Sequence, residues 1–119
     1  MTDDRLSELV HLDGLILENN IYITNEGLKS LTKLKFLDLT RNNLITNDGL
    51  KNLQNLESIN LTGNDNITTD GLPQLKNLIY VCFNIYNNLV NRNDIRLNHL
   101  IFYYKPTYTL SLGYCRFSR

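Results

Sequence analysis

The side chains best suited to acid–base, nucleophilic or metal chemistry in this 119-residue sequence are His11, His99, Cys82 and Cys115. A nucleophile needs a base within hydrogen-bonding reach, and a zinc site needs histidines or cysteines at close spacing. No two of these four residues are close in the sequence, and none has a fixed spacing to a pair of carboxylates. The sequence therefore predicts no catalytic residue, no metal site and no cofactor, and we expect a protein that is not an enzyme.

Length, charge and hydropathy exclude further classes. The length predicts a single domain. Lys+Arg and Asp+Glu are both 12, so no overall field favours nucleic acid or an acidic membrane. No stretch approaches 18 apolar residues, and the N-terminus is acidic and polar rather than a secretory signal. We therefore expect a cytoplasmic protein that does not bind membranes.

An internal repeat of 22 residues dominates the sequence. Eleven or more columns stay in phase over three turns, which we do not attribute to chance. The columns with the same residue throughout are glycine, leucine, asparagine and threonine: Gly27, Gly49 and Gly71; Leu12, Leu34, Leu56 and Leu78; Asn20, Asn42 and Asn64; Thr24, Thr46 and Thr68.

Each unit has two halves with different periods. The first half, Leu-x-x-Leu-x-Leu-x-x-Asn, alternates as a strand does, and the second half has apolar residues three apart, as on one face of a short helix. A threonine before the second half can cap the helix, and the acid two residues later suits the positive end of the helix dipole. Residues 2–6 align with the same pattern, so we expect the chain to open on a helix.

This pattern resembles the leucine-rich repeat, and the Ile-Thr-x-acidic-Gly-Leu part is similar to repeats of F-box-associated leucine-rich-repeat proteins. The resemblance covers about residues 2–83. It implies an α/β fold, a right-handed solenoid with parallel β-strands on the concave face and short helices on the convex face. One unit cannot bury its own leucines, so stacking of the units is also expected on physical grounds.

The repeat predicts the domain organisation. We expect one leucine-rich-repeat domain over residues 1–119, with an N-terminal capping helix at 1–11 and three 22-residue repeats at 12–77. A longer, degenerate repeat would occupy 78–106, with a helix over 91–104 that ends before Pro106. Residues 107–119 would form the terminal strand and cap, with Leu110 and Leu112 facing inward.

An asparagine follows each strand, where the chain turns away from the sheet. A stacked asparagine can bond the backbone of the adjacent turn. We therefore predict a structural ladder formed by Asn20, Asn42, Asn64 and Cys115.

The variable strand positions face the inside of the curve in this architecture. Phe36 and Tyr80 are aromatic where the scaffold needs no ring, and Arg41 and Asp38 could add charge specificity. Aromatic and arginine side chains dominate the energetics of many interfaces, although single exposed aromatic residues are also normal on a surface. The predicted contact residues are Ile16, Glu18, Phe36, Asp38, Arg41, Asn60, Tyr80 and Cys82.

These observations favour a non-enzymatic module that binds a protein or peptide. The resemblance implies an alternative, substrate recognition for a ubiquitin-ligase adaptor. A self-assembling protein is a third hypothesis: residues 1–70 hold 11 acids and 6 bases, and residues 71–119 hold 1 acid and 6 bases, so the solenoid ends carry opposite charge. The aromatic and basic residues after position 100 could stack on single-stranded nucleic acid, but we favour a role in terminal packing.

Overall fold

Six strands form one sheet in which the strand order follows the chain. The computed structural model describes residues 1–83, 89–104 and 116–117. The first five strands are parallel, and the sixth is antiparallel to the fifth. They are β1 (Gly14–Ile16), β2 (Phe36–Asp38), β3 (Ser58–Asn60), β4 (Tyr80–Phe83), β5 (Ile101–Tyr104) and β6 (Arg116–Phe117).

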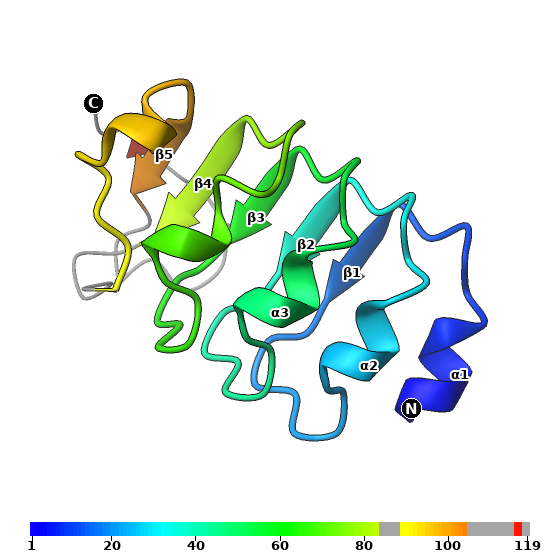
Figure 1. The fold of residues 1–119 in the computed structure, drawn as a ribbon. Coiled ribbons are helices and arrows are strands. Elements are labelled where there is room, and N and C mark those ends of the chain that lie inside the picture. Colours follow the sequence, from blue (N-terminus) through cyan, green and yellow to red (C-terminus); the bar gives the residue numbers. More distant parts are fainter. Residues whose placement is uncertain (84–88, 105–115, 118–119) are drawn as a thin grey trace.

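Short helices return the chain from one strand to the next and lie together on one side of the sheet (Figure 1). They are the α-helices α1 (Asp3–Ser7), α2 (Asn25–Leu28) and α3 (Asn47–Leu50) and the 3-10 helices η1 (Thr69–Gly71) and η2 (Ile95–Leu97). The predicted leucine-rich-repeat solenoid, with parallel strands on one face and short helices on the other, is confirmed.

The core lies between the strands and the helices and is built from equivalent positions of successive repeats. Leu31, Leu34 and Leu37 are fully buried, and the residues 22 positions later are fully buried as well. Each buried leucine side chain contributes about 1.5–3 kcal/mol relative to an exposed one. Because each repeat covers the leucines of its neighbour, the period of the sequence is also the period of the core.

Asparagine side chains link the backbones of adjacent repeats at the turn after each strand. Asn64 is buried, and its Oδ1 accepts hydrogen bonds from the backbone N–H groups of Asn66 and Ile67, both at 2.9 Å. Its Nδ2 donates to the carbonyl oxygens of Leu39 at 2.9 Å and Asn42 at 3.0 Å in the preceding repeat. One amide therefore serves two backbone donors of its own turn and two backbone acceptors of the preceding repeat.

We expect Asn64→Ala to lower the free energy of unfolding by about 3 kcal/mol, because buried backbone groups lose their partners. Asn20→Ala is the matched control, since Asn20 is only half-buried and its Oδ1 accepts from Tyr22 and Ile23 in its own repeat. We expect a loss of about 1 kcal/mol there. Urea denaturation of both variants measures the difference, and equal losses would contradict a role in joining repeats.

A second set of side chains, which the repeat pattern did not predict, joins the helix starts of adjacent repeats. Nδ2 of Asn25 donates to Oγ1 of Thr46 at 2.8 Å, and Oδ1 accepts from the Thr46 backbone N–H at 3.0 Å. Asn47 makes the same pair of bonds to Thr68, at 2.7 and 3.1 Å. The oxygen of each asparagine lies over the glycine of the next repeat, where a Cβ atom would overlap it.

The first member of this set is an aspartate, and the cap that follows it differs. Thr24 donates its hydroxyl and backbone N–H to the Asp3 carboxylate, at 2.6 and 2.8 Å, because a carboxylate only accepts. The Thr24 oxygen also accepts from the Glu26 N–H, as an N-cap does. Thr46 and Thr68 receive an asparagine N–H instead and make no side-chain cap bond.

We expect Gly49→Ala to lower the free energy of unfolding by about 1–3 kcal/mol, because the new Cβ displaces Asn25 from its bonds to Thr46. Gly14→Ala is the matched control, since the nearest atom to its Cβ would be Cδ2 of Phe36, at an ordinary contact distance of 3.8 Å. We expect a change within about 0.5 kcal/mol for this exposed position. Thermal unfolding of both variants compares them, and similar effects would rule out the close contact as the cause.

The fourth repeat differs from the prediction. The helix expected over 91–104 is wrong: only η2 lies there, and residues 101–104 form β5. Tyr80 pairs with Ile101, a step of 21 residues, so the fourth repeat is not longer than the others. Leu97 and Leu100 keep the 22-residue step and are buried. The next buried inward residue, Phe102, follows Leu100 by two positions, whereas Val81 follows Leu78 by three. The strand expected over 107–115 and Cys115 in the ladder lie outside the described residues.

Phe102 explains why the chain after Leu100 is a strand. It pairs with Val81, is fully buried, and its ring meets that of Phe83 edge to face, with 5.6 Å between centroids. Aromatic and β-branched residues favour the pleated, half-buried environment of a strand. The side chains after position 100 were expected to pack in the terminal core, and Phe102 does so.

Arg96 connects η2 to the preceding repeat. Its Nη2 lies 2.9 Å from Oδ1 of Asp70 and 2.9 Å from Oδ2 of Asp94. The hydrogen bonds from Arg96 hold the pKa of the Asp94 carboxyl below its ordinary value. The three side chains are solvated, so this cluster orients the turn more than it stabilises the fold.

Candidate functional site

The exposed side of the parallel strands presents the residues that vary from repeat to repeat. The observed register aligns Gly14, Phe36, Ser58 and Tyr80 across the first four strands, and it aligns Ile16, Asp38, Asn60 and Cys82 in the same way. Ile101 of β5 is paired with Tyr80 and continues the first of these rows. We call this surface the strand face.

Three apolar side chains are exposed on the strand face. Ile16 is 66% exposed, Phe36 37% and Tyr80 38%. Phe36 is paired with Gly14, and a Cβ atom at Gly14 would lie 3.8 Å from Cδ2 of the Phe36 ring. Ser58 on β3 lies between Phe36 on β2 and Tyr80 on β4. The two rings therefore flank a small polar residue, and an inserted side chain could contact both.

Two of the predicted contact residues are buried and do not belong to the exposed surface. Asn60 is buried because its Oδ1 accepts hydrogen bonds from the backbone N–H and the hydroxyl of Thr62, at 3.0 and 2.7 Å. Cys82 is buried with its sulfur 4.0 Å from the Thr62 hydroxyl. In the row that begins at Ile16, the side chains are therefore exposed on β1 and buried on β3 and β4.

Asp38 has a mixed role. It is half-buried, and its Oδ1 accepts from the backbone N–H of Thr40 at 2.8 Å, which fixes the turn at the end of β2. Thr40 itself is buried, and its hydroxyl is the buried side-chain oxygen without a hydrogen-bond partner within the described ranges. The strand face near β2 thus holds a polar group that the fold leaves unsatisfied.

Arg41 and Glu18 form the charged end of the strand face. Nη1 of Arg41 lies 3.7 Å from Oε1 of Glu18, and both side chains are about half exposed. Arg41 has φ +50°, in the left-handed region that favours glycine, and Gly63 occupies the equivalent position of the next repeat with φ +64°. A non-glycine residue in this conformation is strained, and such strain is often found at functional sites. The sequence alone did not reveal it.

Other candidate chemistry does not come together. His11 and His99 are exposed and lie in different repeats. In residues 1–83, 89–104 and 116–117, no group of three or more histidine, cysteine, aspartate or glutamate side chains is arranged to hold a metal ion. Within the same ranges, every helix is too short or too polar to cross a membrane.

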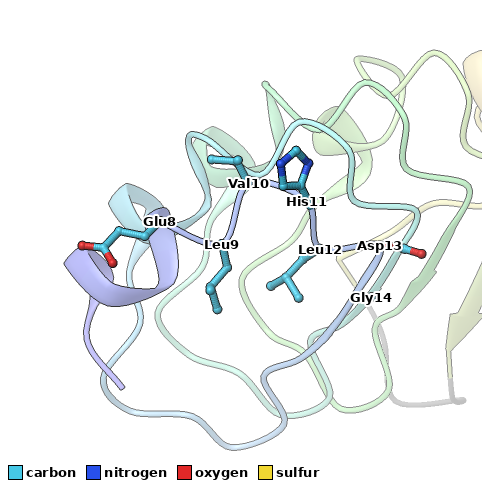
Figure 2. A pocket seen from close by; sticks show the side chains of 7 residues that line it. All are labelled: Glu8, Leu9, Val10, His11, Leu12, Asp13 and Gly14. Carbon is cyan, nitrogen blue, oxygen red and sulfur yellow. The ribbon is translucent and has the colours of Figure 1, made fainter.

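A second surface feature, absent from the sequence predictions, lies at the N-terminal end of the solenoid. The seven residues from Glu8 to Gly14 line an open hollow of about 500 Å³ (Figure 2). Leu9 is exposed there, although Leu31 and Leu53 at the equivalent positions are fully buried. The sequence could have revealed this surface, because Leu9 is 22 residues before the core residue Leu31. The first repeat has a described neighbouring repeat on one side only, so Leu9 stays exposed.

Comparison with known proteins agrees with this architecture. The family model described as "Leucine Rich repeat" matches residues 30–53 and 52–72. Among solved structures, a chain from the crystal structure of the Rad7 and Elc1 complex in yeast superposes with a TM-score of 0.63 and 18% sequence identity. The superposition covers 85% of this chain and 29% of that chain, so this chain spans less than a third of its length. No curated protein matches the sequence significantly.

The two matched segments are leucine-rich repeats, and the described chain has the leucine-rich-repeat fold. Repeat solenoids of this kind are interaction modules, whose stacked units form extended binding surfaces.

We expect Arg41→Gly to be more stable than Arg41→Ala by about 1 kcal/mol, because only glycine adopts a positive φ without strain. Both variants lose the contact with Glu18, so their difference isolates the backbone effect. Chemical denaturation of the two variants measures it. An alanine variant as stable as the glycine variant would show that Arg41 is not strained.

Proposed function

We propose that this protein is a non-enzymatic module that binds a protein or peptide partner through its strand face. The observation that carries the proposal is the contrast between the two sides of the strands: the inward residues Leu37, Ile59 and Val81 are aliphatic and fully buried, while the outward positions carry exposed Ile16, Phe36 and Tyr80. Stability explains the inward residues. Exposure of apolar side chains on adjacent strands does not help the fold, but it suits contact with a partner.

Charged side chains complement these exposed apolar side chains. Arg41 and Glu18 present one cation and one anion at the carboxyl end of the strands. Charges at the rim of an interface select partners and orient them, while central aromatic side chains supply more of the affinity. The partner would therefore place apolar side chains near Phe36 and Tyr80 and a charged or polar group near Arg41.

The size of the strand face limits what it can bind alone. Five strands about 4.8 Å apart, each with about four residues at 3.3 Å, give a patch of roughly 250 Å². A standard interface buries about 800 Å² on each partner. The strand face therefore suits a short peptide, or it forms one part of a larger contact that includes neighbouring loops.

Two other functions stay alternatives. Substrate recognition in a ubiquitin-ligase adaptor rests on the similarity of the repeats to those of F-box-associated proteins. Self-assembly rests on the opposite net charges of residues 1–70 and 71–119. Both would use the same solenoid. The cytoplasmic location and the absence of enzyme activity stay predictions from the sequence.

We expect replacement of Phe36 by the photo-crosslinker p-benzoylphenylalanine to capture the partner in a lysate of source cells, because the new ring takes the place of the exposed one. The captured protein is then titrated with the purified chain by calorimetry. A Phe36→Ala/Tyr80→Ala variant should bind it at least about tenfold more weakly, as loss of central aromatic contacts does.

The control removes apolar side chains of matched exposure outside the strand face. Leu44 and Ile79 are 37% and 41% exposed, so Leu44→Ala/Ile79→Ala removes a similar exposed apolar surface. It should bind within about twofold of the unchanged protein. Equal loss in both double variants, or in neither, would contradict binding through the strand face. Capture of ubiquitin-ligase subunits would favour the adaptor, and capture of the chain itself would favour self-assembly.

A further inference from the structure

The N-terminal edge of the sheet has the features of a second docking surface. Among the described residues, six of the twelve exposed large apolar side chains lie within residues 1–22. The hollow between α1 and β1 lies at the same end, and the side chains of Leu9 and Leu12 project into it in the same direction (Figure 2). Two of the six, Leu9 and Val10, line the hollow and are not buried against the second repeat.

Among the described strands, β1 pairs only with β2, so its backbone offers hydrogen-bonding groups along this edge that no described strand uses. The equivalent groups in β2 identify them. The Phe36 N–H donates to the Asp13 carbonyl at 3.0 Å, and the carbonyls of Asp38 and Thr40 accept from Leu17 and Asn19 at 2.8 and 3.1 Å.

The corresponding groups one repeat earlier are the Gly14 N–H and the carbonyls of Ile16 and Glu18. By the parallel register they point away from β2. Gly14 and Ile16 are exposed, so an added strand could reach them.

Charge decides between the possible occupants. Residues 1–18 carry five acids, Asp3, Asp4, Glu8, Asp13 and Glu18, and one base, Arg5, a net charge of −4. Glu8 and Asp13 flank the hollow and direct their carboxylates outward from it (Figure 2). A second copy of the chain joined through the same end would bring two such charges together, which opposes association. A basic segment would be attracted instead.

We propose that the β1 edge, together with the hollow at Leu9 and Leu12, is a docking site for an extended basic peptide segment. The segment adds to the sheet as a parallel strand, in the mode called β-augmentation. Its N–H groups donate to the carbonyls of Ile16 and Glu18, and one of its apolar side chains enters the hollow. Its basic side chains lie on the other face of the added strand, near Glu18.

The geometry predicts which peptide residues face β1. In β1 and β2, residues whose side chains point into the core, such as Leu17 and Leu39, direct their N–H groups toward the following strand. An added parallel strand that precedes β1 would follow the same rule. Its apolar, core-facing residues would donate to β1, and its basic residues would not.

The test uses a fluorescent seven-residue peptide that alternates lysine with valine, measured by fluorescence anisotropy against the full chain. We expect saturable binding that weakens as salt is added. N-methylation of the valines should weaken binding at least about tenfold, because it removes the N–H groups that reach β1. N-methylation of the lysines should leave binding within about twofold.

Protein variants test the hollow and the charge separately. Leu9→Ser should weaken binding about tenfold, because it replaces an apolar contact of the hollow with a hydroxyl. Asp13→Asn/Glu18→Gln should weaken binding about threefold at low salt, whereas the control Glu57→Gln/Asp65→Asn, which changes two exposed acids of the third repeat, should not. Thermal unfolding of each variant separates loss of binding from loss of folding.

Several outcomes would overturn the proposal. A peptide with glutamate in place of lysine that binds equally well would exclude charge recognition. Insensitivity to both N-methylation patterns would exclude strand addition, and loss only on lysine methylation would replace the parallel arrangement with an antiparallel one. A dimer in sedimentation velocity that Leu9→Ser dissociates and the peptide does not would assign the hollow to a second copy. Binding lost in Phe36→Ala/Tyr80→Ala but not in Leu9→Ser would place the peptide on the strand face.

Discussion

The constraint on which this structure depends is the satisfaction of backbone hydrogen-bonding groups at the turns that follow β2 and β3. Such turns are buried between repeats, and an unpaired buried N–H or carbonyl destabilises a protein by about 1–3 kcal/mol. Asn42 and Asn64 each serve groups on two repeats with one amide. An amide carries both donors and acceptors, so one side chain can serve both kinds of backbone group. The spacing of the repeats follows, because the ladder works only where each asparagine is one turn above the last.

The close approach of successive helix starts follows from the same stacking. Asn25 and Asn47 can bond the threonine of the next repeat only because Gly49 and Gly71 leave room for their side chains. The glycine column therefore reflects packing between repeats. One asparagine set joins adjacent repeats at the turn after each strand, and the other joins them at the helix starts. The leucine core fills the space between the two sets. The polar hydrogen bonds and the apolar packing thus favour the same stacking of the repeats, which is typical of a sequence that specifies one fold.

The sequence predicted the fold wherever the repeat was regular and failed where one residue changed the phase. The register of β1 to β4 follows from residues at intervals of 22, so periodicity alone is enough to predict it. The fifth strand could not be predicted in this way, because Leu97 and Leu100 continue the phase whereas Phe102 comes one residue early. Periodicity predicted which residues align across the outward side of β1 to β4. It cannot show that Asn60 is hydrogen-bonded to Thr62 or that Arg41 has a positive φ. Those properties depend on neighbours in space and on backbone conformation.

In a solenoid, each internal repeat is covered by a neighbour on both sides. A terminal repeat has a neighbour on one side only, so part of its apolar surface needs another cover. The two ends of the described sheet differ in this respect. At the C-terminal end, β6 pairs with β5 and supplies hydrogen bonds to it in an antiparallel arrangement. At the N-terminal end, α1 covers Leu6 but leaves Leu9 exposed and β1 paired on one side. An unprotected strand edge with apolar neighbours favours unwanted association unless charge opposes it. The acids around β1 provide that opposition to another copy, and the same charges would attract a basic strand. Protection against self-association and selection of a partner can therefore come from one group of side chains.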